Sequence, residues 1–196
     1  NDLEGSMLAQ FNQLMTVGSN ENLNIVVQMD YVEGMNGRPG NWKEKDLVAG
    51  QRLLINKDEI VVLEDMEEFD SADPDVLAEF IQWGVTNYPA RRYALILDDH
   101  GGGYTGIGSD WTNQSWMPLP AIAQGLADGL AGVELARFDF LFFYACLMGN
   151  WEVAHQMEPY TQYLLASEEL AIGAAFRLDR IQIAHDDGNV PADTLA

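Results

Sequence analysis

The feature that most constrains the fold of this sequence is the alternation of short apolar segments with helical patterns. Two segments, Tyr93–Leu97 and Phe138–Ala145, are almost entirely apolar, which is typical of strands buried on both faces. A helical pattern follows each of them, at about residues 119–130 and from Asn150 onward. Strands that alternate with helices in this way predict an α/β fold, with a mostly parallel sheet flanked by helices on both faces.

The most reactive side chains of the chain follow the ends of these two predicted strands. His100 lies three residues after Leu97, and Cys146 lies directly after Ala145. The carboxyl ends of parallel strands meet at one edge of a sheet, which is where ligands bind in α/β proteins. We therefore expect the imidazole and the thiol to emerge at the same edge.

An imidazole beside a thiol permits nucleophilic catalysis. A thiol becomes a strong nucleophile when it loses its proton, and a neighbouring imidazole can accept that proton. Cys146 is the single cysteine and thus the only candidate thiol nucleophile. The glycines at 101–103 allow close backbone approach, so the N–H groups of Gly101 and Cys146 are candidates for binding an oxyanion. Alone, such a cysteine is more often a core residue, and the combination at one sheet edge favours catalysis.

The composition argues against several classes of partner. Acidic residues outnumber basic ones 31 to 10, for a formal charge of -21, so a phosphate backbone would be repelled and no nucleic acid is expected. No apolar run is long enough to span a membrane. No second histidine stands at helical ligand spacing from His100, and we predict no metal site. The sequence makes no prediction about oligomeric state.

Two motifs resemble those of a known family. Tyr93–Gly103 (YALILDDHGGG) resembles the histidine motif of the clostripain family of cysteine peptidases, and residues 145–149 (ACLMG) resemble its cysteine motif. The resemblance covers nearly the whole chain. It implies a caspase-like fold and a catalytic dyad of His100 and Cys146 that cleaves peptide or protein substrates. It also implies a secreted or cell-surface protein of a bacterium or archaeon. The chemistry needs no cofactor, and calcium is a candidate activator because some members respond to it.

The chain departs from the family at one position of the substrate pocket. The resemblance implies cleavage after arginine, less often lysine, and the family usually has an acidic residue where this chain has Tyr144. A phenol cannot neutralise a guanidinium as a carboxylate does, so this preference is open to question. Glu168, Glu169 and Asp179 are the candidates to compensate, and the two glutamates are the ones assigned to the pocket. Tyr144, Glu168 and Glu169 are therefore the predicted substrate-binding residues.

Two interpretations remain open. One is a cysteine endopeptidase, and the alternative is a catalytically idle caspase-like domain that binds peptides or partner proteins. The chain begins where the first strand of the family should already have ended. We therefore expect residues 1–196 to form a single peptidase domain that is truncated at both ends and lacks the first strand.

Overall fold

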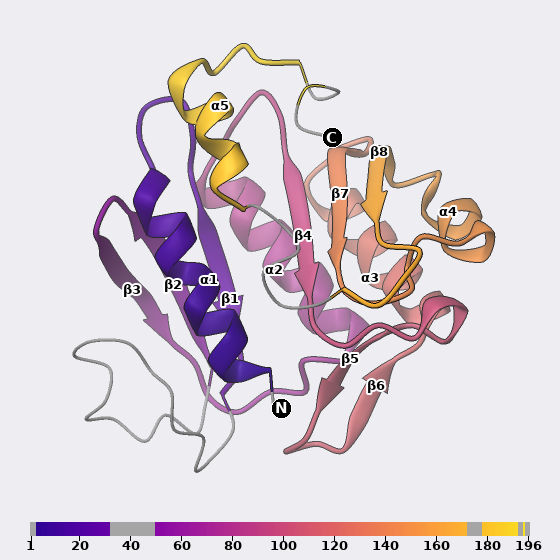
Figure 1. The fold of residues 1–196 in the computed structure, drawn as a ribbon. Helices are drawn as coiled ribbons and strands as arrows, with labels where there is room; N and C mark the ends of the chain where they lie inside the picture. Colours follow the sequence, from indigo (N-terminus) through magenta and orange to yellow (C-terminus); the bar gives the residue numbers. More distant parts are fainter. Residues whose placement is uncertain (1–2, 32–49, 172–177, 192–193, 195–196) are drawn as a thin grey trace. The chain divides into compact units, whose positions relative to one another are not determined.

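The computed structural model describes the chain except for residues 1–2, 32–49, 172–177, 192–193 and 195–196 (Figure 1). The chain divides into two compact units. One comprises Asn1–Phe69 and Phe176–Leu195, and the other comprises Asp70–Ala175. The expectation of a single domain stays a prediction.

The first unit is built on a small antiparallel sheet in which β2 is central. The strands β2 and β3 form a hairpin that turns over Lys57 and Asp58, and Asp58 adopts a positive φ of 60°. Leu53 and Ile55 of β2 are fully buried, whereas most of β3 is exposed, as in a sheet with one solvated face. The elements of this unit are α1 (Glu4–Val17), β1 (Val26–Met29), β2 (Gln51–Asn56), β3 (Glu59–Asp65), η4 (Leu178–Ile181) and α5 (Gln182–Asp186).

The second unit contains the predicted parallel sheet. Its strands are ordered β4-β7-β8, and both neighbouring pairs are parallel. A two-stranded antiparallel hairpin, β5-β6, stands apart from this sheet. The elements are α2 (Pro74–Asn87), β4 (Ala94–Asp98), η2 (Gly103–Thr105), β5 (Ile107–Asp110), β6 (Ser115–Met117), α3 (Leu119–Gly132), β7 (Phe138–Tyr144), α4 (Trp151–Met157) and β8 (Thr161–Ala166).

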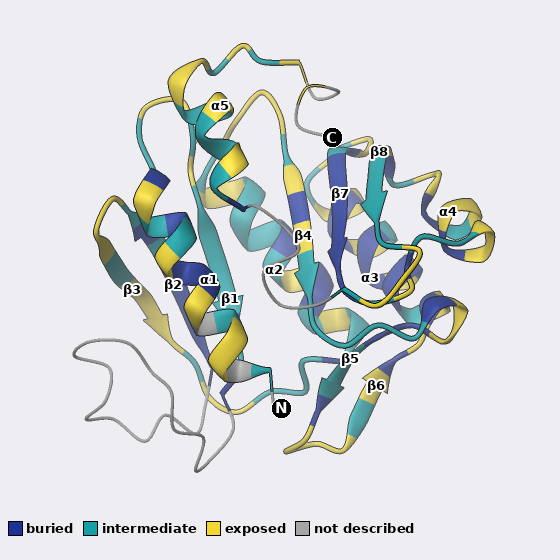
Figure 2. Ribbon diagram, viewed as in Figure 1, coloured by how far each residue is buried: buried dark blue, intermediate teal, exposed yellow. Residues whose placement is uncertain are grey.

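The core of the second unit lies between the parallel sheet and its helices. Leu141 and Phe143 of β7 are fully buried and share one cluster with Ile122 and Leu126 of α3. Helices α2 and α3 lie behind the sheet in Figure 1, and β7 is dark blue along nearly its whole length in Figure 2. Burying these side chains supplies most of the driving force that fixes the strands and hence the loops that follow them. The prediction of an α/β fold with a parallel sheet flanked by helices is confirmed.

The antiparallel sheet of the first unit is separate from the parallel sheet. Its strand β1 covers Val26–Met29. This strand pairs antiparallel with β2, in register from Val26 with Leu54 to Met29 with Gln51. Within the described residues, the parallel pairs are therefore those of β4, β7 and β8.

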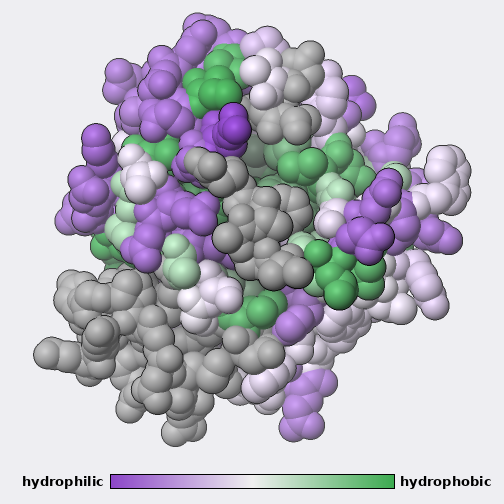
Figure 3. Space-filling view, viewed as in Figure 1, coloured by the Kyte–Doolittle hydropathy of each residue, from purple (hydrophilic) through white to green (hydrophobic). Residues whose placement is uncertain are grey.

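The surface agrees with the acidic composition. Hydrophilic residues cover much of the described surface in Figure 3, and hydrophobic side chains appear there in smaller patches. Among the described residues, no helix combines the length and the apolar character needed to cross a membrane.

Candidate active site

The register of β4 and β7 places His100 and Cys146 at the same level of one sheet edge. Asp98, the last residue of β4, pairs with Tyr144, the last residue of β7. His100 and Cys146 each lie two residues beyond this final pair. Because neighbouring strands are about 4.8 Å apart, both residues start from adjacent points on the edge. The structure therefore brings the two predicted catalytic residues to the arrangement that the sequence predicted.

The histidine loop, residues 99–110, is held mainly by bonds within itself. The N–H of Gly108 donates to the carbonyl of His100 at 3.0 Å, and the N–H of Gly102 donates to the carbonyl of Gly106 at 2.9 Å. These two bonds flank an antiparallel bridge between Gly101 and Ile107. The loop thus turns back on itself as a narrow ribbon directly after β4.

Gly101 brings the histidine loop into contact with the cysteine. A Cβ atom at this position would lie 2.1 Å from the carbonyl oxygen of Cys146 and 2.9 Å from its nitrogen. No side chain fits in that space, so glycine is required here by close backbone approach. The contact fixes the distance between the two loops independently of the strand register.

The cysteine loop, residues 145–150, is held by bonds to the segment that follows β8. The N–H of Leu147 donates to the carbonyl of Glu169 at 3.1 Å, and the N–H of Gly149 donates to that of Ser167 at 2.8 Å. We call residues 167–171 the downstream segment. Leu147, directly after the cysteine, adopts a positive φ of 63°, which is unusual for a residue with a γ-branched side chain.

The thiol of Cys146 is half-buried and contacts the same downstream segment. The N–H of Ala171 donates to its Sγ atom at 3.3 Å, and the carbonyl oxygen of Ala171 lies 3.8 Å from Sγ. The sulfur atom is therefore held between the end of β7 and the backbone that follows β8.

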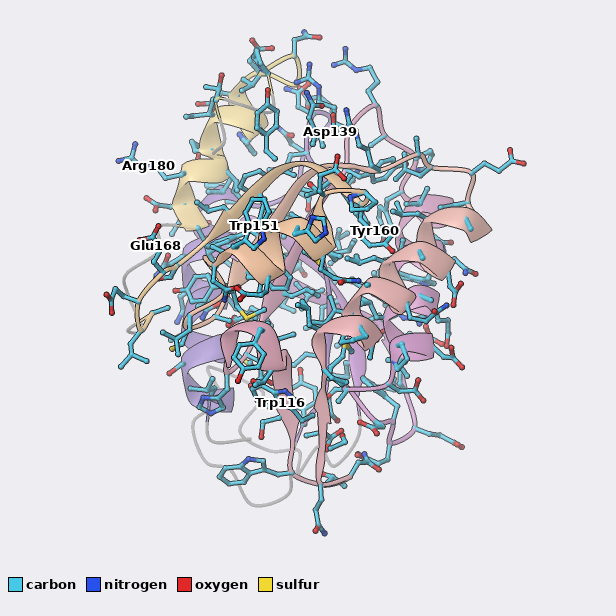
Figure 4. All side chains as sticks on the ribbon, turned by 90° about the vertical axis from the view of Figure 1, so that its right-hand side faces the viewer. Trp116, Asp139, Trp151, Tyr160, Glu168 and Arg180 are labelled. Atoms are coloured by element: carbon cyan, nitrogen blue, oxygen red, sulfur yellow. The ribbon has the colours of Figure 1, made fainter. Side chains whose placement is uncertain are left out.

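Asn150 ends the cysteine loop and begins helix α4. Its side-chain oxygen accepts the N–H of Val153 at 3.0 Å, which caps the helix, and its amide nitrogen donates to the carbonyl of Leu147 at 2.9 Å. One side chain thus joins the loop to the helix. Trp151, the first residue of α4, is 76% exposed and stacks on His155 (Figure 4).

The three predicted substrate-binding residues lie in two different environments. Tyr144 is only 6% exposed, and its ring lies 5.5 Å from that of Phe142, centroid to centroid. Glu168 and Glu169 are exposed on the downstream segment, and Figure 4 labels Glu168 there. The structure therefore places two solvated carboxylates on the segment that touches the cysteine loop, and a buried ring at the position where the family usually has an acidic residue.

Asp99 is a residue of this site that is not among the site residues predicted from the sequence. One oxygen of its carboxylate accepts the N–H of His100, and the other accepts the N–H of Ser109 at 3.3 Å. Burial raises the pKa of Asp99 above its usual value, although these two N–H groups and the charge of His100 act in the opposite direction. An acidic residue before a histidine at a strand end was visible in the sequence, but the burial of its carboxylate was not.

Asp110, a buried carboxylate, supports the far end of the histidine loop. It accepts backbone and side-chain bonds from Ser71 and from Asn113, at 2.9 to 3.3 Å. Burial alone would raise its pKa, but these hydrogen bonds outweigh burial and hold the pKa below its usual value. Since four donors surround the carboxylate, its role is to tie the β5-β6 hairpin to the segment before α2.

Comparisons with known proteins agree with this geometry. The model of the clostripain family matches residues 7–183. Clostripain of Hathewaya histolytica is 29% identical over 213 residues, which cover 92% of this chain and 39% of that protein. This chain thus spans well under half the length of that curated relative.

Solved structures show the same fold. A secreted C11 cysteine protease of Bacteroides thetaiotaomicron, in complex with an irreversible peptide inhibitor, has a TM-score of 0.74 at 23% identity. The likeness covers all of this chain and 54% of that one. An inactive zymogen C11 protease of Parabacteroides distasonis has a TM-score of 0.66 at 23% identity, covering 93% and 49% of the two chains. The fold is therefore caspase-like, and the chain belongs to the clostripain family of cysteine peptidases.

Proposed function

We propose that this chain is the catalytic core of a cysteine endopeptidase. In this mechanism the Sγ atom of Cys146 attacks the scissile carbonyl while His100 takes up the thiol proton. The tetrahedral intermediate then collapses to an acyl-enzyme thioester as His100 gives that proton to the leaving amine. Water hydrolyses the thioester and frees the thiol. The chain spans only part of its relatives, so this activity is a proposal for the chain itself.

The observation that carries the proposal is the shared level of His100 and Cys146 on neighbouring parallel strands, together with the Gly101–Cys146 contact. A nucleophile and its base must stand within reach of one another, and both features restrict that separation. The ribbon bonds of the histidine loop come from Gly102 and Gly108, so the N–H of Gly101 is not used in them. This N–H and that of Cys146 are our candidates for binding the oxyanion.

The proposed substrates are peptides or proteins, with a basic residue before the cleaved bond as the family implies. The buried ring of Tyr144 supplies no charge to such a residue, whereas Glu168 and Glu169 are solvated carboxylates beside the cysteine loop. We assign the recognition of a basic side chain to these two glutamates. The proposed protein is secreted or on the cell surface, and its chemistry uses no cofactor, with calcium as a candidate activator.

The alternative function is a catalytically idle domain that binds peptides. One observation favours it: the thiol is half-buried and its sulfur accepts the N–H of Ala171. A thiol held in this way against its own backbone is less accessible to a substrate carbonyl. The same experiment separates the two functions.

The experiment compares the wild type with Cys146→Ala and His100→Ala against a peptide library varied before the cleaved bond, with calcium and with a chelator. We expect cleavage by the wild type, no cleavage by Cys146→Ala, and alkylation of Cys146 by an iodoacetamide probe. Cleavage that persists in Cys146→Ala would contradict the mechanism. A folded wild type that cleaves nothing and resists alkylation would support the binding domain.

Substrate preference has its own test. The double variant Glu168→Gln, Glu169→Gln removes both charges with little change in size. We expect kcat/KM for arginine-containing peptides to fall about tenfold or more. A hydrogen bond to a charged group contributes roughly 1.5–3 kcal/mol, and the variant loses the charge of both acceptors. Peptides with an uncharged residue at the same position serve as the control and should be cleaved equally by both proteins.

A further inference from the structure

The strongest feature that the proposed function leaves unused is the carboxylate of Asp99. It lies directly after β4 and has one hydrogen-bond partner on each limb of the histidine loop. The N–H of His100 is on the outgoing limb, and the N–H of Ser109 is on the returning limb, within β5. A single side chain therefore joins the residue that carries the proposed base to the strand that supports it.

The chemistry of this contact requires an ionised carboxylate. Both oxygens of an ionised aspartate accept hydrogen bonds, whereas asparagine offers one accepting oxygen and one donating nitrogen. An asparagine side chain of the same shape would thus keep one N–H bond and set its own N–H group against the other. The pair of hydrogen bonds to the N–H groups of His100 and Ser109 can therefore be reduced to one without changing the size of the side chain.

The location of Asp99 gives this contact a defined effect on the site. Asp98 is paired with Tyr144 in the sheet, so the backbone before Asp99 is fixed by the strand. Gly101, two residues after Asp99, is fixed by its contact with Cys146. Asp99 and His100 are the two residues between these fixed points. The hydrogen bond to the N–H of His100 determines the orientation of the peptide unit that carries the imidazole.

We propose that Asp99 is a positioning residue: its ionised carboxylate holds the backbone of His100 and of Ser109 together and so orients the imidazole toward Cys146. The inference rests on the proposed peptidase function. Among the described residues, His100 is the titratable group whose charge acts on Asp99. The negative carboxylate therefore lies in the field of the residue that carries positive charge during the reaction.

The linkage between protonation and folding distinguishes this role from a purely structural one. Because burial raises the pKa of Asp99 in the folded chain above its usual 3.8, the folded state binds this proton more tightly than the unfolded state. The stabilising contribution is present below pH 3.8 and is lost as the pH rises through the raised pKa. At neutral pH the ionised carboxylate thus lowers stability, a situation typical of functional groups rather than structural ones.

The test compares Asp99→Asn with the wild type in three measurements. We expect kcat at neutral pH to fall about 10- to 100-fold with little change in KM, because small misplacements of a catalytic group have effects of this size. We expect the midpoint of urea unfolding at neutral pH to stay equal or to rise, and the advantage of Asp99→Asn to disappear at acidic pH. Asp99→Glu, which keeps the charge one methylene further out, should recover part of kcat.

The matched control is Asp139→Asn. Asp139 is also a carboxylate next to β4, where it accepts the N–H of Tyr93 at 2.9 Å, but it lies at the opposite end of the strand from His100. Its replacement should leave kcat unchanged. An unchanged kcat in Asp99→Asn would overturn the proposal, and so would a fall in kcat that is matched by a loss of stability at neutral pH.

A separate readout keeps this inference distinguishable from the peptidase function. Amide hydrogen exchange of the peptide that spans residues 99–110 does not require activity. Even if the wild type cleaves no substrate, the amide of His100 or of Ser109 that faces the new side-chain N–H group should exchange faster in Asp99→Asn than in the wild type. Equal exchange rates would overturn the positioning role whatever the activity of the wild type.

Discussion

The two loops at the candidate active edge of the sheet are supported in opposite ways. The histidine loop is held by bonds among its own residues, from Asp99 to Gly108. The cysteine loop is held by Ser167, Glu169 and Ala171, about twenty residues further along the chain. The location of the proposed base is thus encoded locally, whereas that of the nucleophile depends on the segment after β8. Changes in the first loop should act mainly on the geometry of the site, and changes in the second should act more strongly on stability.

The largest expected effect is that of Gly101→Ala, where the two loops touch. The new Cβ would lie 2.1 Å from the carbonyl oxygen of Cys146, so one loop must move. We expect kcat/KM to fall by about 100-fold, because a displacement of this size misaligns the catalytic groups. Gly84→Ala, in a helix with nothing within 4 Å of its added Cβ, is the control. Full activity of Gly101→Ala would show that the loops need not be in contact.

A smaller effect is expected from Gly149→Ala in the cysteine loop. Its Cβ would lie 2.8 Å from backbone atoms of Ser167 and Glu168, so the downstream segment must shift. Overpacking of this kind costs about 1–3 kcal/mol, and we expect that loss in urea unfolding together with a lower rate of Cys146 alkylation. A loss of activity without any loss of stability would contradict the contrast between the two loops.

The replacement Asn150→Ala should have a moderate effect, mainly on stability. It removes the cap of α4 and the bond to the carbonyl of Leu147. Loss of a cap costs about 1 kcal/mol, which thermal unfolding can measure. Asn150→Asp keeps the accepting oxygen but not the donating nitrogen. It should therefore preserve the cap while still loosening the cysteine loop, and equal stability of the two variants would argue that the cap contributes little.

The smallest effect is predicted for Trp116→Phe. The indole Nε1 of Trp116 donates to the carbonyl of Thr105 at 2.8 Å, next to the turn of the histidine loop. Phenylalanine removes this bond but keeps an aromatic ring. We expect about 0.5–1 kcal/mol of lost stability and less than a threefold change in kcat, since the loop has other bonds of its own. A large change in kcat would identify Trp116 as a substrate contact instead.

The sequence predicted those parts of the fold that rest on strong periodic patterns. The strand at Phe138–Tyr144 and the helix at Leu119–Gly132 lie within two residues of their expected bounds. Asp73 caps α2 and accepts the N–H of Asp75, as an Asp-Pro pair at the start of a helix favours. Such patterns depend only on residues that are close in sequence. They were sufficient to predict that His100 and Cys146 lie at the same edge of the parallel sheet.

Other features depend on contacts that a sequence does not reveal. The β5-β6 hairpin has no strong strand pattern in the sequence, because its strands are short and its support comes from Asp110 and Ser71. The thiol of Cys146 contacts the backbone N–H of Ala171, 25 positions further along the chain. Every residue except proline has such an N–H group, so the identity of residue 171 does not reveal the contact. The burial of Asp99 likewise depends on how the loop closes.

The parallel pairing of β4 and β7 also determines when the site forms during folding. The β2-β3 hairpin closes over two residues, and hairpins of this kind form in about 1–10 μs. In contrast, β4 meets β7 only after the hairpin β5-β6 and the helix α3 have been traversed, and such long-range pairs form slowly. The loops that carry His100 and Cys146 therefore come together late, when most of the second unit is complete. Under the proposed mechanism, a chain that is still folding or still being synthesised lacks the pair of groups that the reaction needs.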